Sequence, residues 1–526
     1  MAHNASPKTL GDVARSQAAL RGEAVALCFE DRRTSFAVFD RHSNAVGNGL
    51  IAAGIRKGDH ISYLGKNSDS YFEILFGAAK IGAVMTPINW RLAAPEILYI
   101  LRDCEARVLF VGPEFIATAA SLAKELPALT LTIAVEGAQD GWPGYTAWRA
   151  AQSTTDPGIA TTPDDIALQL YTSGTTGRPK GAMLRHVGLL SLVRDTSGEP
   201  PDWRIWGPGD VSLVAMPIFH IGGTGWGLTG LVYGAKGVIA REFNPAQVLD
   251  YIQRDKITKI FMVPAAMQIV VRDPRARQTD FSGIKYILYG ASPIPVPLLR
   301  ECMAVFGCGF VQMYGMTEAS GTIVVLPPED HDPQGSPRMR AAGKPLPGVE
   351  IAILDAEGRT LPPHQVGEIT TRSCANMAGY WNLPEATAKT IDAEGWLRTG
   401  DAGFLDEDGY LYIQDRVKDL IISGGENVYP AEVENAICGH PDVADVAVIG
   451  VPDPKWGEAV KAIVVLKPGC APSAEEIITF ARRNIAAYKA PKSIDFAESL
   501  PRNPSGKILR RELREPYWAN AERRVN

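Results

Sequence analysis

Strand and helix signals alternate along the first hundred residues, and this alternation is the feature that most restricts the fold. Apolar segments at 60–65, 83–87 and 107–111 have the length of buried strands, and amphipathic segments stand between them. Helices are expected to begin near Ser68 and Pro95. The same pattern returns between residues 165 and 325. Because strands joined by helices pair in parallel, the sequence predicts an α/β fold with mostly parallel sheets covered by helices.

From about residue 340 the pattern changes to short strands and turns rich in proline and glycine. The segment Asp-Glu-Asp-Gly at 406–409 is typical of a hairpin turn, and strand residues follow it directly. This part of the chain therefore predicts a small antiparallel sheet or barrel.

A second α/β unit is expected to begin near residues 416–419. It contains a helix opened by Pro430, strands at 443–451 and 462–466, and a helix with a Ser-x-x-Glu capping box at Ser473. About 110 residues are enough for an independent domain. We therefore predict a large N-terminal domain at 1–417 and a smaller, mobile C-terminal α/β domain at 418–526.

Composition restricts the partners and the compartment. The chain has 526 residues, of which 46% are hydrophobic and 21% charged, and its net charge is −6. These values are typical of a soluble globular protein with no overall attraction for nucleic acid or anionic lipid. The 7 cysteines are scattered and form no CxxC pair, which argues against a disulfide framework or a zinc site. No signal peptide is visible, and we expect a cytoplasmic protein.

Residues 211–235 contain no Asp, Glu, Lys or Arg and are long enough to cross a bilayer. They also contain six glycines, Pro217 and His220, and no basic flank adjoins them. The sequence therefore predicts buried strands and turns that line an apolar cavity. The glycines are expected to leave room there for a chain or a ring.

The run YTSGTTGRPKG at 171–181 directly follows an apolar strand at 166–170. Its glycines and hydroxyl residues supply a dense set of N–H and O–H donors, and Lys180 adds a positive charge. The run therefore predicts a loop that binds the phosphates of ATP, and the residues after it are expected to lead toward a helix. It differs from the phosphate loop of kinases and GTPases, because Pro179 and Gly181 stand where that motif requires glycine and Ser or Thr.

Six further segments, together with this run, resemble the motifs of the adenylate-forming superfamily in order and spacing. That superfamily comprises acyl- and aryl-CoA synthetases, luciferases and peptide-synthetase adenylation domains. The resemblance covers nearly the whole chain and is strongest to the fatty-acyl-CoA synthetase and coumarate-CoA ligase branch. The segments are MPIFHIGG (216–223), YGAS (289–292), YGMTE (314–318), GWLRTGD (395–401), DRVKDLIISGGENVYPAEVE (415–434) and PRNPSGK (501–507).

The resemblance implies the residues of a nucleotide site. Tyr314 and the turn Gly290-Ala291-Ser292 would enclose adenine, and Asp401 would accept hydrogen bonds from both ribose hydroxyls. Arg416 would assist at the ribose and phosphate. Glu318 would hold Mg²⁺ as a hard oxygen ligand. The other implied ATP-binding residues are Thr172, Ser173, Gly174, Thr175, Thr176, Gly177, Lys180, Gly315 and Thr317.

The resemblance also implies catalytic and acyl-binding residues. Lys507 would reach from the C-terminal domain to the α-phosphate and the substrate carboxylate, where it offsets negative charge. His220 would lie beside that carboxylate, although a buried core histidine is an equal alternative. Lys418 would be the hinge between the domains. The implied acyl pocket contains His220, Gly222, Gly223, Tyr289, Gly290 and Gly315, and the implied CoA channel contains Ser423, Gly424 and Gly425.

The implied reaction has two steps. The carboxylate attacks the α-phosphorus of ATP to give acyl-AMP and pyrophosphate, and the thiol of CoA then displaces AMP. ATP and Mg²⁺ are the implied cofactors and CoA the co-substrate, and the sequence leaves the oligomeric state open.

The sequence restricts the identity of the acid less than it restricts the reaction. The expected pocket segments, 211–235 and 289–317, contain no Arg or Lys before Arg300, which favours an uncharged acyl group over a dicarboxylate. We expect a medium- or long-chain fatty acid, with an aryl acid such as a hydroxycinnamate as the alternative. An acyl-AMP ligase that supplies a carrier protein, and a catalytically silent acyl or nucleotide sensor, are further alternatives.

Overall fold

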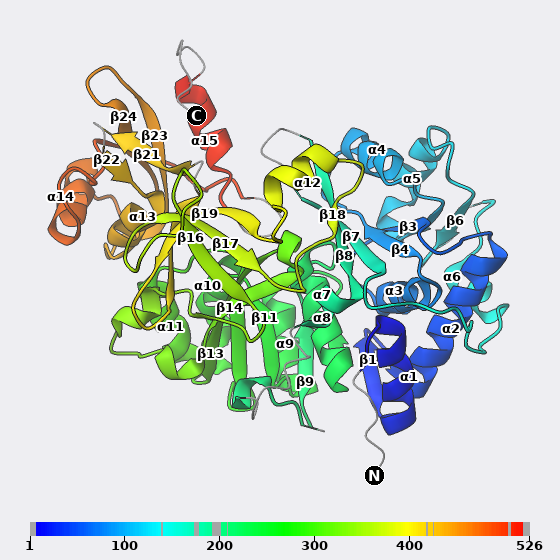
Figure 1. Ribbon diagram of the computed structural model, residues 1–526. Coiled ribbons are helices and arrows are strands. Elements are labelled where there is room, and N and C mark those ends of the chain that lie inside the picture. Colours follow the sequence, from blue (N-terminus) through cyan, green and yellow to red (C-terminus); the bar gives the residue numbers. More distant parts are fainter. Residues whose placement is uncertain are drawn as a thin grey trace.

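The part of the chain that the structure describes folds around four β-sheets, whose strands are drawn as arrows in Figure 1. The computed structural model describes residues 7–137, 140–172, 178–191, 201–207, 209–416, 419–423, 426–502 and 507–518, without the side chains of Asp415, Arg416 and Asn427.

A seven-stranded sheet carries the first βα units in the strand order β18-β8-β7-β4-β3-β5-β6. Strands β7, β4, β3, β5 and β6 are parallel, whereas β8 and β18 pair antiparallel at one edge. The prediction of a mostly parallel sheet is confirmed for this part. The strands are β3 (His60–Leu64), β4 (Val84–Pro87), β5 (Val108–Val111), β6 (Leu131–Ala134), β7 (Ile166–Thr172), β8 (Lys180–Arg185) and β18 (Gly379–Tyr380).

The helices of this part begin at the predicted signals. The Ser68 hydroxyl accepts a hydrogen bond from the Tyr71 amide and caps α3 (Asp69–Ile81). Pro95 lies in the first turn of α4 (Ala94–Asp103). Every residue of α3 is buried, because this helix packs against α2 and against strands of both large sheets. The remaining helices here are α1 (Leu10–Arg21), α2 (Phe36–Ala52), α5 (Ile116–Ala123), α6 (Tyr145–Ala150) and α7 (His186–Leu189).

A nine-stranded sheet follows in the order β15-β14-β13-β12-β11-β9-β10-β1-β2. Its inner strands from β13 to β1 are parallel, and the edge strands β2, β14 and β15 are antiparallel. The strands are β1 (Val25–Phe29), β2 (Arg32–Ser35), β9 (Val211–Val214), β10 (Lys236–Ile239), β11 (Lys259–Met262), β12 (Tyr286–Gly290), β13 (Gly309–Met316), β14 (Gly321–Leu326) and β15 (Lys344–Pro345). Its helices include α8 (Ile221–Tyr233), α9 (Pro245–Asp255), α10 (Pro264–Arg272) and α11 (Val296–Phe306).

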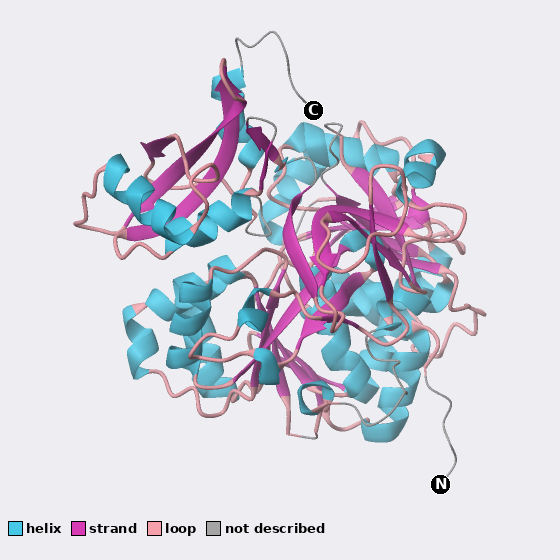
Figure 2. Ribbon diagram, turned by 60° about the vertical axis from the view of Figure 1, so that its left-hand side comes forward, coloured by secondary structure: helices cyan, strands magenta, loops and turns pink. Residues whose placement is uncertain are grey.

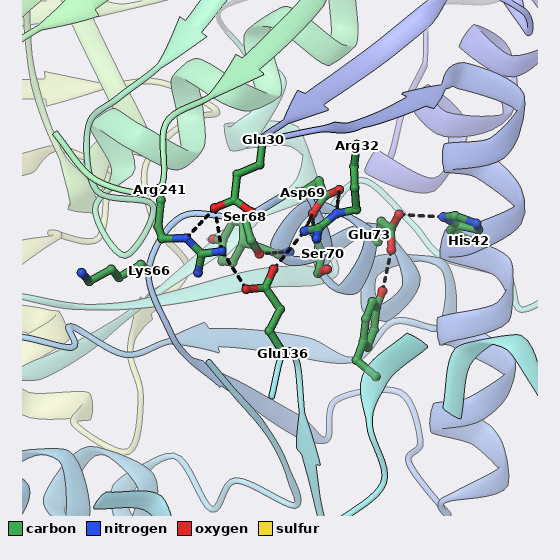
Figure 3. A network of polar contacts seen from close by, with 12 residues as sticks. Glu30, Arg32, His42, Lys66, Ser68, Asp69, Ser70, Glu73, Glu136 and Arg241 are labelled. Atoms are coloured by element: carbon green, nitrogen blue, oxygen red, sulfur yellow. Dashed lines mark hydrogen bonds and ion pairs between the residues drawn. The ribbon is translucent and has the colours of Figure 1, made fainter. Parts of the chain in front are cut away.

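Two arginines join the ends of these sheets (Figure 3). Arg32 contacts Asp69 at 2.7 Å and Glu136 at 3.0 Å. Arg241 contacts the same Glu136 at 2.7 Å and Glu30 at 2.9 Å. Because Glu136 follows β6 and Arg241 follows β10, this partly buried set of ion pairs connects the two sheets directly.

The small antiparallel sheet is confirmed. Its strand order is β16-β17-β19-β20, and Gly409 N donates to Asp406 O in the predicted turn between β19 and β20. Gly409 has a φ of 79°, which favours glycine at this position. The strands are β16 (Glu350–Leu354), β17 (Gly367–Arg372), β19 (Leu397–Leu405) and β20 (Leu411–Arg416), and α12 (Pro384–Thr390) lies between β18 and β19.

The C-terminal residues form a separate sheet with its own apolar core. Figure 1 shows it as a lobe above α10 and α11, and Figure 2 shows the lobe from another side. Gln268 Nε2 of α10 donates to Ala444 O of this lobe at 3.2 Å. Glu476 N donates to the Ser473 hydroxyl at 3.2 Å, so the predicted capping box is confirmed. The predicted domain boundary at 417/418 lies outside the described residues and stays a prediction. The elements are β21 (Ile421–Ser423), β22 (Glu426–Val428), α13 (Pro430–Cys438), β23 (Val443–Asp453), β24 (Gly457–Leu466), α14 (Ala474–Asn484), β25 (Ser493–Phe496) and α15 (Arg510–Trp518).

The apolar segment 211–235 differs from the prediction of strands and turns. After β9, most of it forms the helix α8, and its glycines serve close packing more than open space. A Cβ atom on Gly227 would stand 2.2 Å from the Phe72 ring, and one on Gly223 would stand 2.2 Å from the Pro217 carbonyl. Among the described residues, the structure contains no helix of the length and apolarity needed to cross a membrane.

The residues after Lys180 first form β8 and then lead into the short helix α7, as the sequence predicts. Burial alternates along β8, which pairs with β7 on one side and β18 on the other. The segment 173–179 therefore connects two antiparallel strands of one sheet.

Candidate functional site

The predicted phosphate loop is held at both ends by a β-ladder. Thr172 at the end of β7 and Lys180 at the start of β8 are directly paired. The predicted residues Ser173, Gly174, Thr175, Thr176 and Gly177 lie outside the described residues. This pairing holds the two ends of the loop side by side, where β7 ends and β8 begins in the seven-stranded sheet.

Glu318 meets this loop from the other large sheet. It lies in the short turn Thr317–Ala319 after β13, and its side chain is buried. The Thr172 hydroxyl donates to Glu318 Oε1 at 3.2 Å. The structure therefore brings together the predicted phosphate-binding loop and the predicted metal ligand, which are far apart in the sequence.

Tyr380 is a site residue that the sequence analysis missed. Its hydroxyl donates to Glu318 Oε1 at 2.9 Å, and Lys180 Nζ lies 4.8 Å from the centre of its ring. Tyr380 belongs to β18, which pairs with β8 beside the phosphate loop. Only the pairing of β18 with β8 could have revealed it, because Tyr380 carries no motif of its own.

The donors around Glu318 are compatible with a divalent cation. A carboxylate and a threonine hydroxyl are hard oxygen groups, and Mg²⁺ commonly combines one or two such ligands with water and phosphate oxygens. Glu318 would hold the ion, and the ion would offset charge on the phosphates.

The predicted adenine and ribose residues also meet. The Tyr314 hydroxyl donates to Asp401 Oδ2 at 2.7 Å, and Asp401 is buried. Asp401 N donates to the Thr399 hydroxyl at 3.1 Å, which holds the backbone of Asp401 in β19. Arg416 is the directly paired residue on β20. Tyr314, Asp401 and the backbone of Arg416 therefore lie next to one another at the predicted nucleoside site.

The turn after β12 is built by close backbone contact. A Cβ atom on Gly290 would stand 2.1 Å from Met313 O, and one on Gly315 would stand 1.8 Å from Gly321 O. Ala291 has a φ of 68° and is exposed, and Ser292 follows it. Glycine at 290 and 315 allows the ends of β12, β13 and β14 to approach, which places the turn beside Tyr314.

His220 is held at the start of α8 by buried polar groups. The segment before it is fixed by Asn67, whose Oδ1 accepts from Ile218 N at 3.1 Å. The Tyr71 and Thr224 hydroxyls share a hydrogen bond of 2.7 Å beneath it. His220 O accepts from Thr224 N at 3.0 Å. These contacts leave the backbone of His220 little freedom.

Positive charges from two other segments act on the His220 ring. Its Nε2 atom is buried and has no hydrogen-bond partner among the described residues. Burial above all, together with the positive charges of Arg91 and Lys507, lowers the pKa of His220 to about 4. The imidazole is therefore neutral near pH 7. Lys507 belongs to the C-terminal lobe, so a charge from that lobe acts on His220 in the N-terminal part.

Arg91 lay outside the two pocket segments considered in the sequence analysis. The absence of Lys and Arg before Arg300 in those segments therefore does not make the neighbourhood of His220 free of positive charge. This weakens the sequence argument against an acid with a second anionic group.

The remaining predicted residues belong to the acyl pocket and the CoA channel. The Tyr289 ring is fully buried, and its hydroxyl donates to Gln312 Oε1 at 3.1 Å and contacts His331 Nε2 at 2.9 Å. Gly222 faces the Phe261 ring, 3.1 Å from where its Cβ atom would be. Ser423 is buried at the end of β21. Lys418, Gly424 and Gly425 lie outside the described residues, and these roles stay predictions.

Comparison with known proteins agrees with the motifs. The model of the AMP-binding enzyme family matches residues 14–381. The model of the AMP-binding enzyme C-terminal domain matches residues 432–507. Together they cover both the large sheets and the C-terminal lobe.

Similar proteins differ in the acid and the acceptor that their names give. The chain is 45% identical to the fatty acid–[acyl-carrier-protein] ligase ScoC of Streptomyces coeruleorubidus, over 95% of each chain. It is 37% identical to a feruloyl-CoA synthase of Amycolatopsis, over 97% of this chain and 99% of the other. The crystal structure of the anthranilate CoA ligase AuaEII in complex with anthranoyl-AMP has a TM-score of 0.88 at 30% identity, over 97% of each chain. The chain therefore belongs to the AMP-binding enzymes, the adenylate-forming acid–thiol ligases.

Proposed function

We propose that this protein is an AMP-forming acyl-CoA synthetase that converts a medium- or long-chain fatty acid, ATP and CoA to acyl-CoA, AMP and pyrophosphate. The observation that carries the proposal is the hydrogen-bonded group of Thr172, Glu318 and Tyr380 at the end of β7. From the C-terminal lobe, the positive charge of Lys507 acts on His220 at the start of α8. An ammonium at that place can offset the charge of a carboxylate as it approaches the α-phosphate.

The nucleotide side supports the same reaction. Thr172, Glu318 and Tyr380 form one hydrogen-bonded group, and Tyr314 and Asp401 form another. The first group would hold Mg²⁺ and the phosphates, and the second would hold the nucleoside. The buried position of Glu318 strengthens its attraction for a cation, because solvent screens the charge less there.

The neighbourhood of His220 supports an apolar acyl group. The rings of Trp90 and Phe219 lie edge to face at 6.1 Å, and Phe219 is adjacent to His220. Gly222 and Phe261 extend the apolar surface along α8. The similarity to a fatty acid ligase supports a fatty acid, whereas the similarity to a feruloyl-CoA synthase keeps an aryl acid as the second candidate.

Two further parts of the proposal concern the second step. The chain would pivot at Lys418, between a domain of residues 1–417 and one of residues 418–526, and Ser423 would line the path of the pantetheine thiol. A carrier protein is the alternative acceptor, because the fatty acid ligase with 45% identity is named for one.

Product analysis tests the acid and the acceptor together. The purified protein is supplied with ATP, Mg²⁺ and either dodecanoate, palmitate, coumarate or ferulate, and AMP is measured with CoA, with a phosphopantetheinylated carrier protein or with neither. We expect the fastest AMP formation with a fatty acid and CoA. A best rate with coumarate or ferulate would replace the acid, and a rate that responds only to the carrier protein would replace the acceptor.

A further inference from the structure

Asp103, at the C-terminal end of α4, contacts the strand that leads into the predicted phosphate loop. The Tyr171 hydroxyl donates to Asp103 Oδ2 at 2.5 Å. Tyr171 precedes Thr172, the last residue of β7 before the loop. The carboxylate of Asp103 therefore contacts the strand by which the chain enters the loop.

Asp103 also connects to the strand by which the chain leaves the loop. Its carbonyl accepts a hydrogen bond from Trp381 Nε1 at 2.8 Å. The backbone N–H of Trp381 donates to Gly181 O at 2.8 Å, and Gly181 is the second residue of β8. One residue of α4 therefore holds both ends of the loop, one through its side chain and one through its backbone.

The Tyr171 hydroxyl is fixed from its other side as well. Gln169 Nε2 donates to it at 3.2 Å, and Gln169 Oε1 contacts His60 Nε2 at 3.1 Å. Gln169 is fully buried, and a Cβ atom on Gly181 would stand 2.5 Å from its amide nitrogen. Burial, above all, raises the pKa of Tyr171 well above its usual range, so the hydroxyl stays a donor to Asp103.

A second contact from the same helix reaches the loop. The Tyr99 hydroxyl donates to Pro179 O at 3.3 Å, and the Arg178 guanidinium lies 5.7 Å from the centre of the Tyr99 ring. The C-terminal half of α4 thus contacts residues on both sides of the segment 173–177.

We propose that Asp103 is a positioning residue for the phosphate loop, and that its hydrogen bond from Tyr171 fixes the strand end from which the loop begins. The proposal rests on the proposed adenylation function. A group that orients the loop contributes when the triphosphate binds and when pyrophosphate leaves. It contributes little when acyl-AMP, which carries no pyrophosphate, reacts with the thiol.

Two variants remove the hydrogen bond from opposite ends. Tyr171→Phe deletes the donor and keeps the ring, and Asp103→Leu deletes the carboxylate. We expect each to lower kcat/KM for ATP in acyl-adenylate formation about tenfold, mostly through KM, because a hydrogen bond to a charged acceptor is lost. The double variant is expected to match either single variant. Thioester formation from supplied acyl-AMP should stay within about twofold of the unmodified protein.

Arg102→Ala is the matched control. Arg102 is the neighbour of Asp103 on α4, and its side chain pairs with Glu125 at the surface. This variant should leave the KM for ATP unchanged. Thermal unfolding of all variants distinguishes a displaced loop from general loss of the fold.

Each outcome bears on the proposal. Equal loss of both half-reactions, or single effects that multiply in the double variant, would show that Asp103 does not act through Tyr171 on the loop. An unchanged KM for ATP in both single variants would overturn the proposal and leave the adenylation function intact. If the unmodified protein formed no acyl-AMP, the proposed function itself would fail, and the two failures are therefore distinguishable.

Discussion

The nucleotide side and the carboxylate side of the candidate site are built differently. On the nucleotide side, Glu318 is joined to Thr172 and Tyr380 by hydrogen bonds within the large N-terminal part. On the carboxylate side, His220 Nε2 is buried without a hydrogen-bond partner among the described residues. The positive charges that act on His220 include that of Lys507, which belongs to the C-terminal lobe.

This difference separates binding from chemistry. Groups that already bond to one another are preorganised, so the nucleotide side needs little rearrangement when ATP arrives. In the proposed mechanism, the carboxylate side is complete only when the C-terminal lobe delivers Lys507. Variants on both sides should therefore slow acyl-adenylate formation, but through different kinetic constants.

The largest expected effect is that of Lys507→Ala. Removing the ammonium should lower the rate of acyl-adenylate formation about a thousandfold, because the proposed compensation of the developing charge is lost. Thioester formation from supplied acyl-AMP should remain within about twofold. Both rates are measured by product quantification. Lys492→Ala, which changes an exposed lysine of the same lobe, is the control, and equal loss of both half-reactions in Lys507→Ala would remove the distinction between the two sides.

Glu318→Gln tests the nucleotide side. The variant keeps the shape of the side chain but loses its charge, and we expect adenylation to fall about a hundredfold. Because the amide is a weaker ligand, the Mg²⁺ concentration that gives half-maximal activity should rise. A titration with Mg²⁺ measures it. An unchanged Mg²⁺ dependence would assign the ion to other groups.

Lys418→Pro tests whether the lobe must move between the two steps. Proline restricts φ at the proposed hinge, so thioester formation should slow about tenfold while adenylation changes little. Single-turnover measurements of the two steps give the comparison. If both rates matched those of the unmodified protein, the pivot would lie at another residue.

The smallest expected effect concerns the buried neutral state of His220. Its folded pKa of about 4 is below the value of about 6.5 in an unfolded chain, so the unfolded state binds the proton first as the pH falls. Stability is therefore lost between about pH 6.5 and pH 4, with about 1–2 kcal/mol from this group at pH 5. His220→Gln should lose less stability between pH 7 and pH 5 than the unmodified protein does, as measured by urea unfolding at the two pH values. Identical losses would show that His220 is protonated alike in the folded and unfolded states.

Much of the fold was predictable because local signals decide it. The cap at Ser68, the proline at the start of α4 and the turn at Gly409 act on their neighbours in the chain, and each is found where the sequence places it. The helix α8 was not predictable in this way. Its glycines pack against Phe72 and the Pro217 carbonyl, and such contacts depend on the tertiary structure.

The candidate site shows the same division. Glu318, Tyr314 and Asp401 belong to motifs, and the structure places them in hydrogen-bonded groups that agree with the implied nucleotide site. Tyr380 and Arg91 have no motif, and they reach the site through the pairing of distant strands or the course of a loop. Sequence reasoning recognises residues whose chemistry recurs, whereas it misses those that act through their position in space.

The most direct test of adenylation as the first step is a single turnover with the thiol withheld. The unmodified protein is mixed with ATP, Mg²⁺ and palmitate, and the products are quantified by mass spectrometry before and after CoA is added. We expect acyl-AMP and pyrophosphate to form first, and acyl-CoA and AMP to replace the acyl-AMP when CoA is added. Formation of ADP and phosphate, or of acyl-CoA without a preceding acyl-AMP, would contradict this expectation.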